Sequence, residues 1–193
     1  MPRINNDTFY EKALKKHGAN AKGLNWHDDY SQLKRFEIIH ELIQNDIQDT
    51  DIMIDAGCGF GDFYGFITDY HDIRYIGYDI VEENVAIAKE RTGQTIMIKD
   101  ILNEPLEEAD FYIASGSMNI LSRFETFLFI ERCFTLSRKG FVFNLPYGKD
   151  ESKHFNYFLP QEIKHFSKKF DCEIIIKSGY LPHDFTVYLR KVK

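Results

Sequence analysis

The sequence predicts an α/β fold in which helices alternate with the strands of a mostly parallel sheet. Three observations lead to this prediction. A short apolar run at 52–55 leads through a glycine-rich turn into a helix. Further short apolar segments alternate with helical ones along the chain, which is typical of βαβ units. Two final strand-like segments, 172–177 and 185–191, are joined by a loop and predict a closing antiparallel hairpin.

Two helices are expected before the sheet, at 9–17 and 30–45, with a polar loop between them that holds the only tryptophan, Trp26. The expected core strands are 52–55, 74–79, 95–98, 109–114 and 141–145, and the expected helices between and after them are 63–70, 81–91, 126–138 and 160–170. Gly140 is expected to cap the helix before the fifth strand.

Composition limits the classes of function. The 193 residues suit one domain with a sizeable core. A net charge of −6 argues against nucleic acid as a partner, because phosphate binding needs clustered Lys and Arg, and it favours a small-molecule substrate. The three cysteines, Cys58, Cys133 and Cys172, form no zinc-type cluster, so no metal site is expected. With no apolar stretch typical of a signal peptide or a bilayer span, we expect a cytoplasmic protein without membrane contact.

The glycine-rich turn places Gly57, Gly59 and Gly61 on alternate positions after Asp55. The dinucleotide fingerprint G-x-G-x-x-G would need a glycine at position 62, which is Asp62. Glycines at such a turn allow a positive φ angle, close approach to a ligand, or close packing of a helix on the sheet. A carboxylate beside the turn suits a ligand that carries positive charge, hydroxyls or amines.

A second acid, Asp79, ends the next predicted strand eighteen residues after Gly61. This is close to the offset of about 20 residues at which an acid meets ribose hydroxyls in nucleoside-binding folds. A third acid, Asp100, follows the third predicted strand. Three acids in order at the ends of three strands indicate one ligand site along the carboxyl edge of the sheet.

The stretch from Asp55 to Gly61 resembles motif I of the class I S-adenosylmethionine-dependent methyltransferases, whose ligand has an ammonium and a sulfonium. The resemblance covers nearly the whole chain. It implies a Rossmann-like, doubly wound, seven-stranded sheet, mostly parallel with an antiparallel C-terminal hairpin strand, plus N-terminal helices. It also implies one methyltransferase domain, 1–193, with 1–46 as an N-terminal helical lid and 47–193 as the cofactor-binding core. The implied cofactor is S-adenosyl-L-methionine, and the product is S-adenosyl-L-homocysteine.

The resemblance also implies the cofactor contacts. Asp79 would hold the ribose, Asp100 the adenine amine, and the backbone near Ile101 the adenine ring. In the N-terminal segment Trp26, Tyr30, Gln32 and Arg35 are candidates to line the mouth, although Trp26 packed on the core and Arg35 in water would fit as well. The implied cofactor-binding residues are Trp26, Arg35, Asp55, Ala56, Gly57, Gly59, Gly61, Asp79, Ile80, Asp100, Ile101, Ser115 and Gly116.

Methyl transfer from a sulfonium needs an acceptor held in line, exclusion of water and, for a hydroxyl acceptor, removal of a proton. His154 and Tyr147 are the preferred catalytic pair, because the loop after strand five commonly faces the acceptor in this fold. The segment Asn144 to Tyr147 is similar to the N-P-P-Y tetrapeptide of nucleic-acid amino-methyltransferases. It follows strand five instead of strand four and lacks the first proline, so we interpret it as a coincidence.

We therefore expect an S-adenosylmethionine-dependent methyltransferase that acts on a small molecule at an oxygen atom, as a monomer or a homodimer. Two alternatives stay open: a cofactor-binding methyltransferase-fold subunit without catalysis, and a nucleic-acid N-methyltransferase. A nucleotide-dependent oxidoreductase is disfavoured by Asp62 in the glycine turn and by Asp100.

Overall fold

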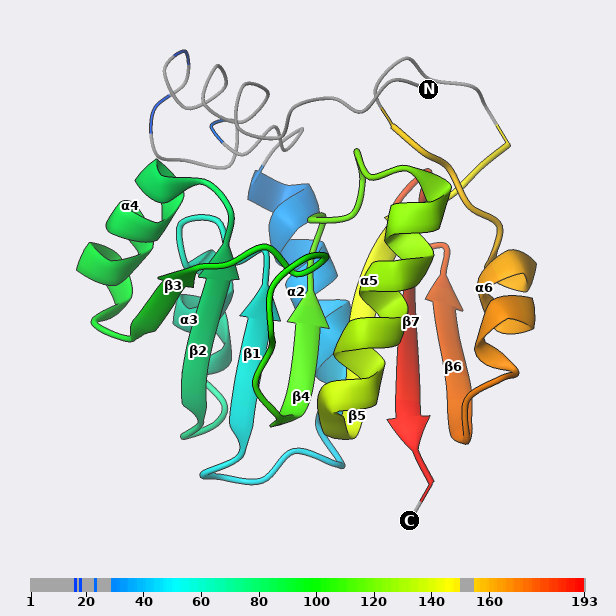
Figure 1. Cartoon of the computed structure of the whole chain (residues 1–193), viewed down its shortest axis with the longest axis horizontal. Coiled ribbons are helices and arrows are strands. Elements are labelled where there is room, and N and C mark those ends of the chain that lie inside the picture. The colour runs from blue at the N-terminus through cyan, green and yellow to red at the C-terminus, as the bar shows by residue number, and fades with distance from the viewer. Residues whose placement is uncertain (1–15, 17, 19–22, 24–28, 150–154, 193) are drawn as a thin grey trace.

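The computed structural model describes residues 16, 18, 23, 29–149 and 155–192, and a seven-stranded sheet forms its centre (Figure 1). The strands are β1 (Ile52–Ala56), β2 (Arg74–Asp79), β3 (Thr95–Ile98), β4 (Ala109–Ala114), β5 (Ser137–Pro146), β6 (Cys172–Ser178) and β7 (Asp184–Lys191). Their order is β3-β2-β1-β4-β5-β7-β6, and β7 runs antiparallel to both of its neighbours. The predicted sheet, mostly parallel with an antiparallel closing hairpin, is confirmed.

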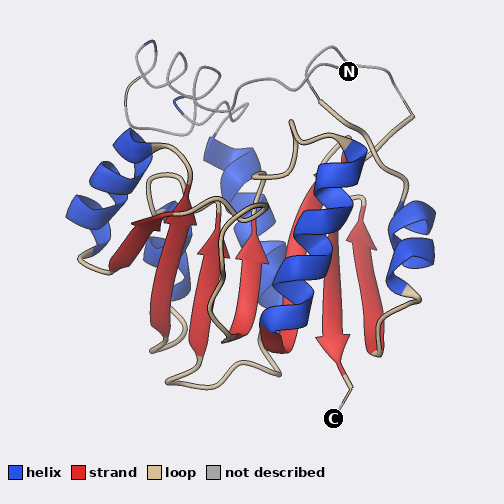
Figure 2. Cartoon of the chain, viewed as in Figure 1, coloured by secondary structure: helices blue, strands red, loops and turns tan. Residues whose placement is uncertain are grey.

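Helices cover both faces of the sheet (Figure 2). They are α2 (Asp29–Ile43), α3 (Asp62–Ile67), α4 (Glu82–Thr92), α5 (Arg123–Leu136) and α6 (Pro160–Ser167). Phe36, Phe63 and Val85 bring α2, α3 and α4 into one apolar cluster, whereas Phe129 and Ile163 bring α5 and α6 into a second. The central strands are apolar on both sides because each side carries a helix layer.

The predicted elements differ from the structure mainly around α5 and β5. α5 begins earlier than predicted, because the Ser122 side chain and Glu125 form a reciprocal capping box. The expectation that Gly140 caps the helix is wrong, since Gly140 lies inside β5 opposite Arg190. A Cβ at position 140 would lie 2.5 Å from the Leu189 carbonyl oxygen, so a glycine is needed where β7 approaches β5. The helix expected at 9–17 falls almost entirely outside the described residues.

The strand order reverses beside β1, with β2 and β3 on one side and β4 on the other. Open α/β sheets bind ligands at the carboxyl ends of the strands at such a point. None of the helices in the described part of the chain has both the length and the apolar character needed to span a bilayer.

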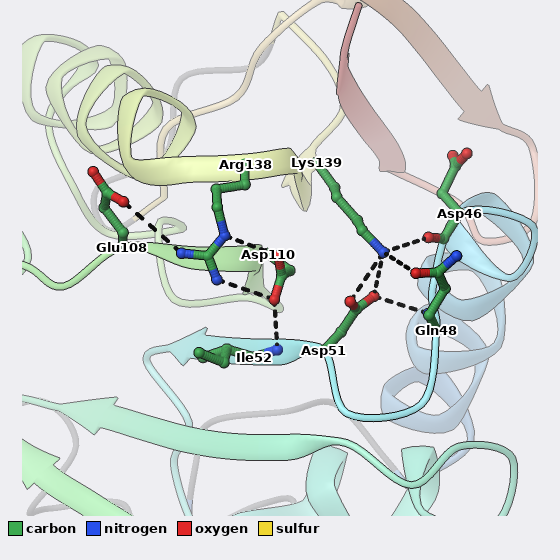
Figure 3. Close-up of polar contacts among 8 residues, drawn as sticks. All are labelled: Asp46, Gln48, Asp51, Ile52, Glu108, Asp110, Arg138 and Lys139. Carbon is green, nitrogen blue, oxygen red and sulfur yellow. Dashed lines mark hydrogen bonds and ion pairs between the residues drawn. The ribbon is translucent and has the colours of Figure 1, made fainter. Parts of the chain in front are cut away.

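A polar network lies where the strands begin, at the end of the sheet opposite the carboxyl ends of the parallel strands. It joins the start of β5 to the starts of β1 and β4 (Figure 3). Lys139 Nζ donates to both carboxylate oxygens of Asp51, at 2.9 and 2.7 Å. Arg138 donates to Asp110 at 2.9 and 3.1 Å, and Asp110 also accepts from the Ile52 N–H at 2.9 Å. From the sequence, Arg138 and Lys139 are expected at the end of a helix. In the structure they instead fix the first residues of β5.

We expect Lys139→Ala to lower the free energy of unfolding by about 1–3 kcal/mol, because it leaves the Asp51 carboxylate, only 8% exposed, without its cation. Urea denaturation would measure this loss. Lys177→Ala is the matched control: the ion pair of Lys177 with Glu41 is more exposed and should contribute less than about 1 kcal/mol. Equal losses in the two variants would contradict the role assigned to Lys139.

Candidate active site

A cavity opens at the carboxyl ends of β1, β2 and β4, where the strand order reverses. Of the residues predicted for the cofactor, it gathers Asp55, Gly57, Gly59, Asp79, Ile80, Asp100, Ile101, Ser115 and Gly116. The rest of its lining consists of Gln32, Phe36, Cys58, Asp62, Phe63, Tyr78, Asn84, Lys99, Leu102, Ser117, Asn119, Leu121, Phe129 and Phe155. The predicted acids therefore do meet at one site.

The loop between β1 and α3 turns sharply because Gly57, Gly59 and Gly61 all have positive φ angles, at 89°, 55° and 80°. The Gly57 N–H donates to the Tyr78 carbonyl at 2.7 Å, which ties the loop to β2. A Cβ on Gly57 would lie 2.2 Å from the Ser117 Cβ, so only a residue without a side chain fits between the two loops. Gly61 packs under α4 instead of lining the cavity.

Asp79 ends β2 and holds the glycine loop with its carboxylate. Its Oδ2 accepts from the Gly59 N–H at 2.9 Å, and its Oδ1 accepts from the Val81 N–H at 2.9 Å and from Asn84 Nδ2 at 3.3 Å. Burial raises the pKa of Asp79 to about 6, although these hydrogen bonds lower it. Asp79 therefore both lines the cavity and fixes the loop above it, a second role that the sequence did not indicate.

Asp55 lies at the end of β1, beside the glycine loop, and is 2% exposed. Burial raises the pKa of its carboxyl to about 7, and the charges of Asp79 and Asp62 also raise this pKa. The Tyr75 hydroxyl donates to Oδ2 at 2.7 Å and lowers the pKa. A positively charged ligand group beside Asp55 would favour the ionised carboxylate.

Asp100 shapes the turn after β3. Its Oδ1 accepts from the Leu102 N–H at 2.8 Å, and its Oδ2 accepts from Asn103 Nδ2 at 2.6 Å. These bonds fix the turn with Asp100 and Ile101 on the cavity wall. Each carboxylate oxygen can accept more than one hydrogen bond, so Asp100 keeps acceptor capacity for a ligand amine.

The loop after β4 is held from behind by Asn144 of β5. Asn144 Oδ1 accepts from the Gly116 N–H at 2.9 Å, and Asn144 Nδ2 donates to Ser115 Oγ at 3.3 Å. Asn144 is 1% exposed, so its amide supports the loop and does not face the cavity. The Ser117 hydroxyl, in contrast, is buried at the cavity wall without a hydrogen-bond partner among the described residues. A ligand with a polar group there would satisfy it.

Asp62 lines the cavity but is not among the site residues predicted from the sequence, where it appears only as a departure from the dinucleotide fingerprint. Asp62 Oδ2 accepts from Gln32 Nε2 at 3.0 Å, and Oδ1 accepts from Arg91 Nη1 at 3.2 Å. Its place at the first residue of α3, where carboxylates are favoured, is the signal that could have found it. The hydrogen bond between Gln32 and Asp62 therefore holds α2 beside the cavity.

Other predicted residues lie elsewhere. The Arg35 guanidinium pairs with Asp184, a residue that is 3% exposed, and Arg35 does not line the cavity. Tyr147 is 43% exposed, its N–H donates to the His183 carbonyl at 2.9 Å, and it too is outside the lining. Ala56 is fully buried at the end of β1. Trp26 and His154 lie outside the described residues.

Comparisons with known proteins relate the chain to methyltransferases. Residues 54–140 match the family model described as "Methyltransferase domain", which spans the glycine loop, Asp79 and Asp100. No curated protein sequence matches the chain significantly.

Solved structures share the fold at low identity. Magnesium protoporphyrin IX methyltransferase from Synechocystis PCC 6803, with bound S-adenosylmethionine, has a TM-score of 0.75 at 14% identity, covering 100% of both chains. The 1,6-didemethyltoxoflavin-N1-methyltransferase from Burkholderia thailandensis, with bound 1,6-didemethyltoxoflavin and S-adenosylhomocysteine, has a TM-score of 0.72 at 14% identity, covering 100% of this chain and 93% of the other. The match to the family model and the shared fold lead to one conclusion: residues 54–140 match a methyltransferase domain, and the chain has the fold of S-adenosylmethionine-dependent methyltransferases.

Proposed function

We propose that the protein transfers a methyl group from S-adenosylmethionine to an oxygen atom of a small organic acceptor. The observation that supports this most directly is the row of acids Asp55, Asp79 and Asp100. They lie at or just after the ends of three neighbouring parallel strands and face one cavity. A cationic ligand with a ribose and an adenine offers a donor group to each of them in turn.

The residues present fit this cofactor. Asp79 would accept from the ribose hydroxyls, and Asp100 from the adenine amine, with Ile101 against the ring. Asp55 would lie on the side of the amino-acid portion. The Ser117 hydroxyl, which has no hydrogen-bond partner among the described residues, offers a further polar contact.

When bound, the cofactor supplies a methyl carbon that its sulfonium already activates. The chain contributes orientation and exclusion of water. We assign the acceptor side of the cavity to Asn119, Leu121 and Phe155, which lie on the loop after β4 and on the segment before α6. The Asn156 N–H donates to the Asn119 carbonyl at 3.1 Å and joins these two segments. Two apolar side chains and one amide suit a small organic acceptor, and the 1,6-didemethyltoxoflavin-N1-methyltransferase of similar fold has 1,6-didemethyltoxoflavin bound.

A hydroxyl acceptor must lose its proton. We propose His154 and Tyr147 for this role; Phe155, the residue that follows His154 in the sequence, lines the cavity. We also propose that residues 1–46 act as a lid, with Trp26 over the cofactor. Arg35, held by Asp184, would support α2 beside the mouth instead of touching the ligand.

The nucleic-acid alternative loses its only motif, because the Asn144 amide is engaged by the loop after β4 and does not line the cavity. The subunit alternative, binding without transfer, is separated from the enzyme by measuring both binding and turnover.

The first test is calorimetric titration of the purified chain. We expect saturable binding of S-adenosylmethionine and S-adenosylhomocysteine and none of NAD; binding of NAD alone would contradict the proposal. Incubation with methyl-labelled S-adenosylmethionine and matched small alcohols, phenols and amines then tests the acceptor atom. We expect label on the hydroxyl compounds. Label on amines alone would overturn the oxygen acceptor, and tight binding without any transfer would favour the non-catalytic subunit.

A further inference from the structure

Tyr75 is a buried residue of β2 that lies outside the cavity lining, yet its hydroxyl reaches the site. It is 2% exposed, and its hydroxyl donates to Asp55 Oδ2 at 2.7 Å. The residue of β2 in register with Asp55 is Gly77, which has no side chain. Tyr75 lies two residues before Gly77 and so on the same face of the sheet, and no β2 side chain stands between its ring and the end of β1.

We propose that Tyr75 is a positioning residue for methyl transfer: its hydroxyl fixes the Asp55 carboxylate in its ionised form, oriented toward the positively charged part of the bound cofactor. The inference rests on the proposed place of Asp55 in the cofactor site. It assigns a task to a side chain that need not touch the cofactor.

The surroundings of Asp55 explain why such a donor is needed. Burial is the main cause of its raised pKa, and the carboxylates of Asp79, at the end of β2, and Asp62, on α3, raise it further. The Cys58 thiol, in the glycine loop, adds no negative charge of its own, because burial and the charges of Asp79 and Asp55 raise its pKa well above the usual range. Among the groups of the described residues that act on Asp55, the Tyr75 hydroxyl is the one that lowers its pKa.

Tyr75 can do this over a wide range of pH. Burial and the neighbouring Asp55 charge raise the pKa of the Tyr75 hydroxyl well above its ordinary value, so it stays protonated and remains a donor. A neutral donor to a buried carboxylate favours the charged form without adding a competing cation to the site.

The expected pH dependence has a definite sign. The folded-state pKa of Asp55 is raised, to about 7, so ionising it for a cationic cofactor becomes less costly as pH rises through this range. Without the Tyr75 hydroxyl this pKa rises further. We therefore expect Tyr75→Phe to move the pH midpoint of S-adenosylmethionine affinity up by about one unit, which weakens binding about fivefold at pH 7, about tenfold at acidic pH and little at alkaline pH.

Calorimetric titration of the native chain and of Tyr75→Phe with S-adenosylmethionine, over a pH series from acidic to alkaline, tests the inference. The cofactor's own titration cancels in the comparison. Tyr188→Phe is the matched control, since Tyr188 is also fully buried and its hydroxyl donates to a carboxylate, Asp46, at 3.1 Å. Its profile should coincide with that of the native chain.

A second background separates positioning from general packing. In Asp55→Asn, which cannot ionise, adding Tyr75→Phe should leave the pH profile unchanged. Coinciding profiles of the native chain and Tyr75→Phe would overturn the inference, and so would a shift that persists in the Asp55→Asn background. Absence of S-adenosylmethionine binding by the native chain at every pH would overturn the proposed cofactor site itself, and the inference with it.

Discussion

Asp79→Ala should weaken S-adenosylmethionine binding by about 1–3 kcal/mol and also lower the free energy of unfolding, because the variant leaves buried donors unpaired. The Gly59 N–H, the Val81 N–H and the Asn84 amide all donate to this carboxylate, and the ribose hydroxyls are proposed to do so. Calorimetry would measure the affinity, and urea denaturation the stability. The affinity loss combines a lost ligand contact with a loosened loop.

Two further variants separate these effects. Asp79→Asn keeps one acceptor oxygen but no charge, so it should preserve more of the loop than Asp79→Ala does. Asp110→Ala is the matched control: it removes the acceptor of the Ile52 N–H at the opposite edge of the sheet, and should lower stability without changing affinity. Unchanged affinity in a folded Asp79→Ala would remove Asp79 from the cofactor site.

Gly57→Ala should cost about 2–5 kcal/mol in stability and strongly reduce cofactor binding. Part of this, about 1–2 kcal/mol, is the strain of an alanine at a φ of 89°. The rest, about 1–3 kcal/mol, is overlap with the Ser117 Cβ, which would lie 2.2 Å from the new methyl group. A side chain at position 57 would thus push apart the loop after β1 and the loop after β4.

Gly93→Ala isolates the strain. Gly93 has a φ of 65°, and no atom lies within 4 Å of a Cβ built there, so its alanine variant should lose only about 1–2 kcal/mol. Combining Gly57→Ala with Ser117→Gly should restore the stability that is lost to overlap but not the stability that is lost to strain. A double variant no more stable than Gly57→Ala alone would show that contact with Ser117 is not the cause. Denaturant unfolding and calorimetry report both quantities.

Most of the sheet could be predicted from sequence because β2, β3 and β4 are short apolar runs between polar or turn-forming residues. The start of β5 could not, because Arg138 and Lys139 are charged and look like the exposed end of a helix. Their charges are balanced by Asp110 and Asp51, acids distant in sequence that the sheet brings to the same edge.

The candidate site, like the sheet, has features that the sequence predicts and features that it does not. The acids at or just after the ends of β1, β2 and β3 could be predicted to share one cavity, because the carboxyl ends of parallel strands meet at one edge. The partners of those acids depend on strand register and on long-range packing. Tyr75 reaches Asp55 only because β1 and β2 pair with Gly77 beside it. Arg35 pairs with Asp184, 149 residues away, and no local pattern marks such a partner.

The position of β7 between β5 and β6 has a consequence for folding. β6 comes before β7 in the chain, yet within the described part of the sheet its hydrogen-bonded neighbour is β7. During synthesis β1 to β5 can pair as they emerge, whereas β6 must wait for residues 184–191 before it can join. The pairing of β7 with β5 spans residues 147–183 of the chain, and such non-local pairing slows folding; until β7 is made, the isoleucine-rich β6 has no strand partner. β6 forms the edge of the sheet farthest from the glycine loop. We therefore expect the addition of this edge to be the last step of folding.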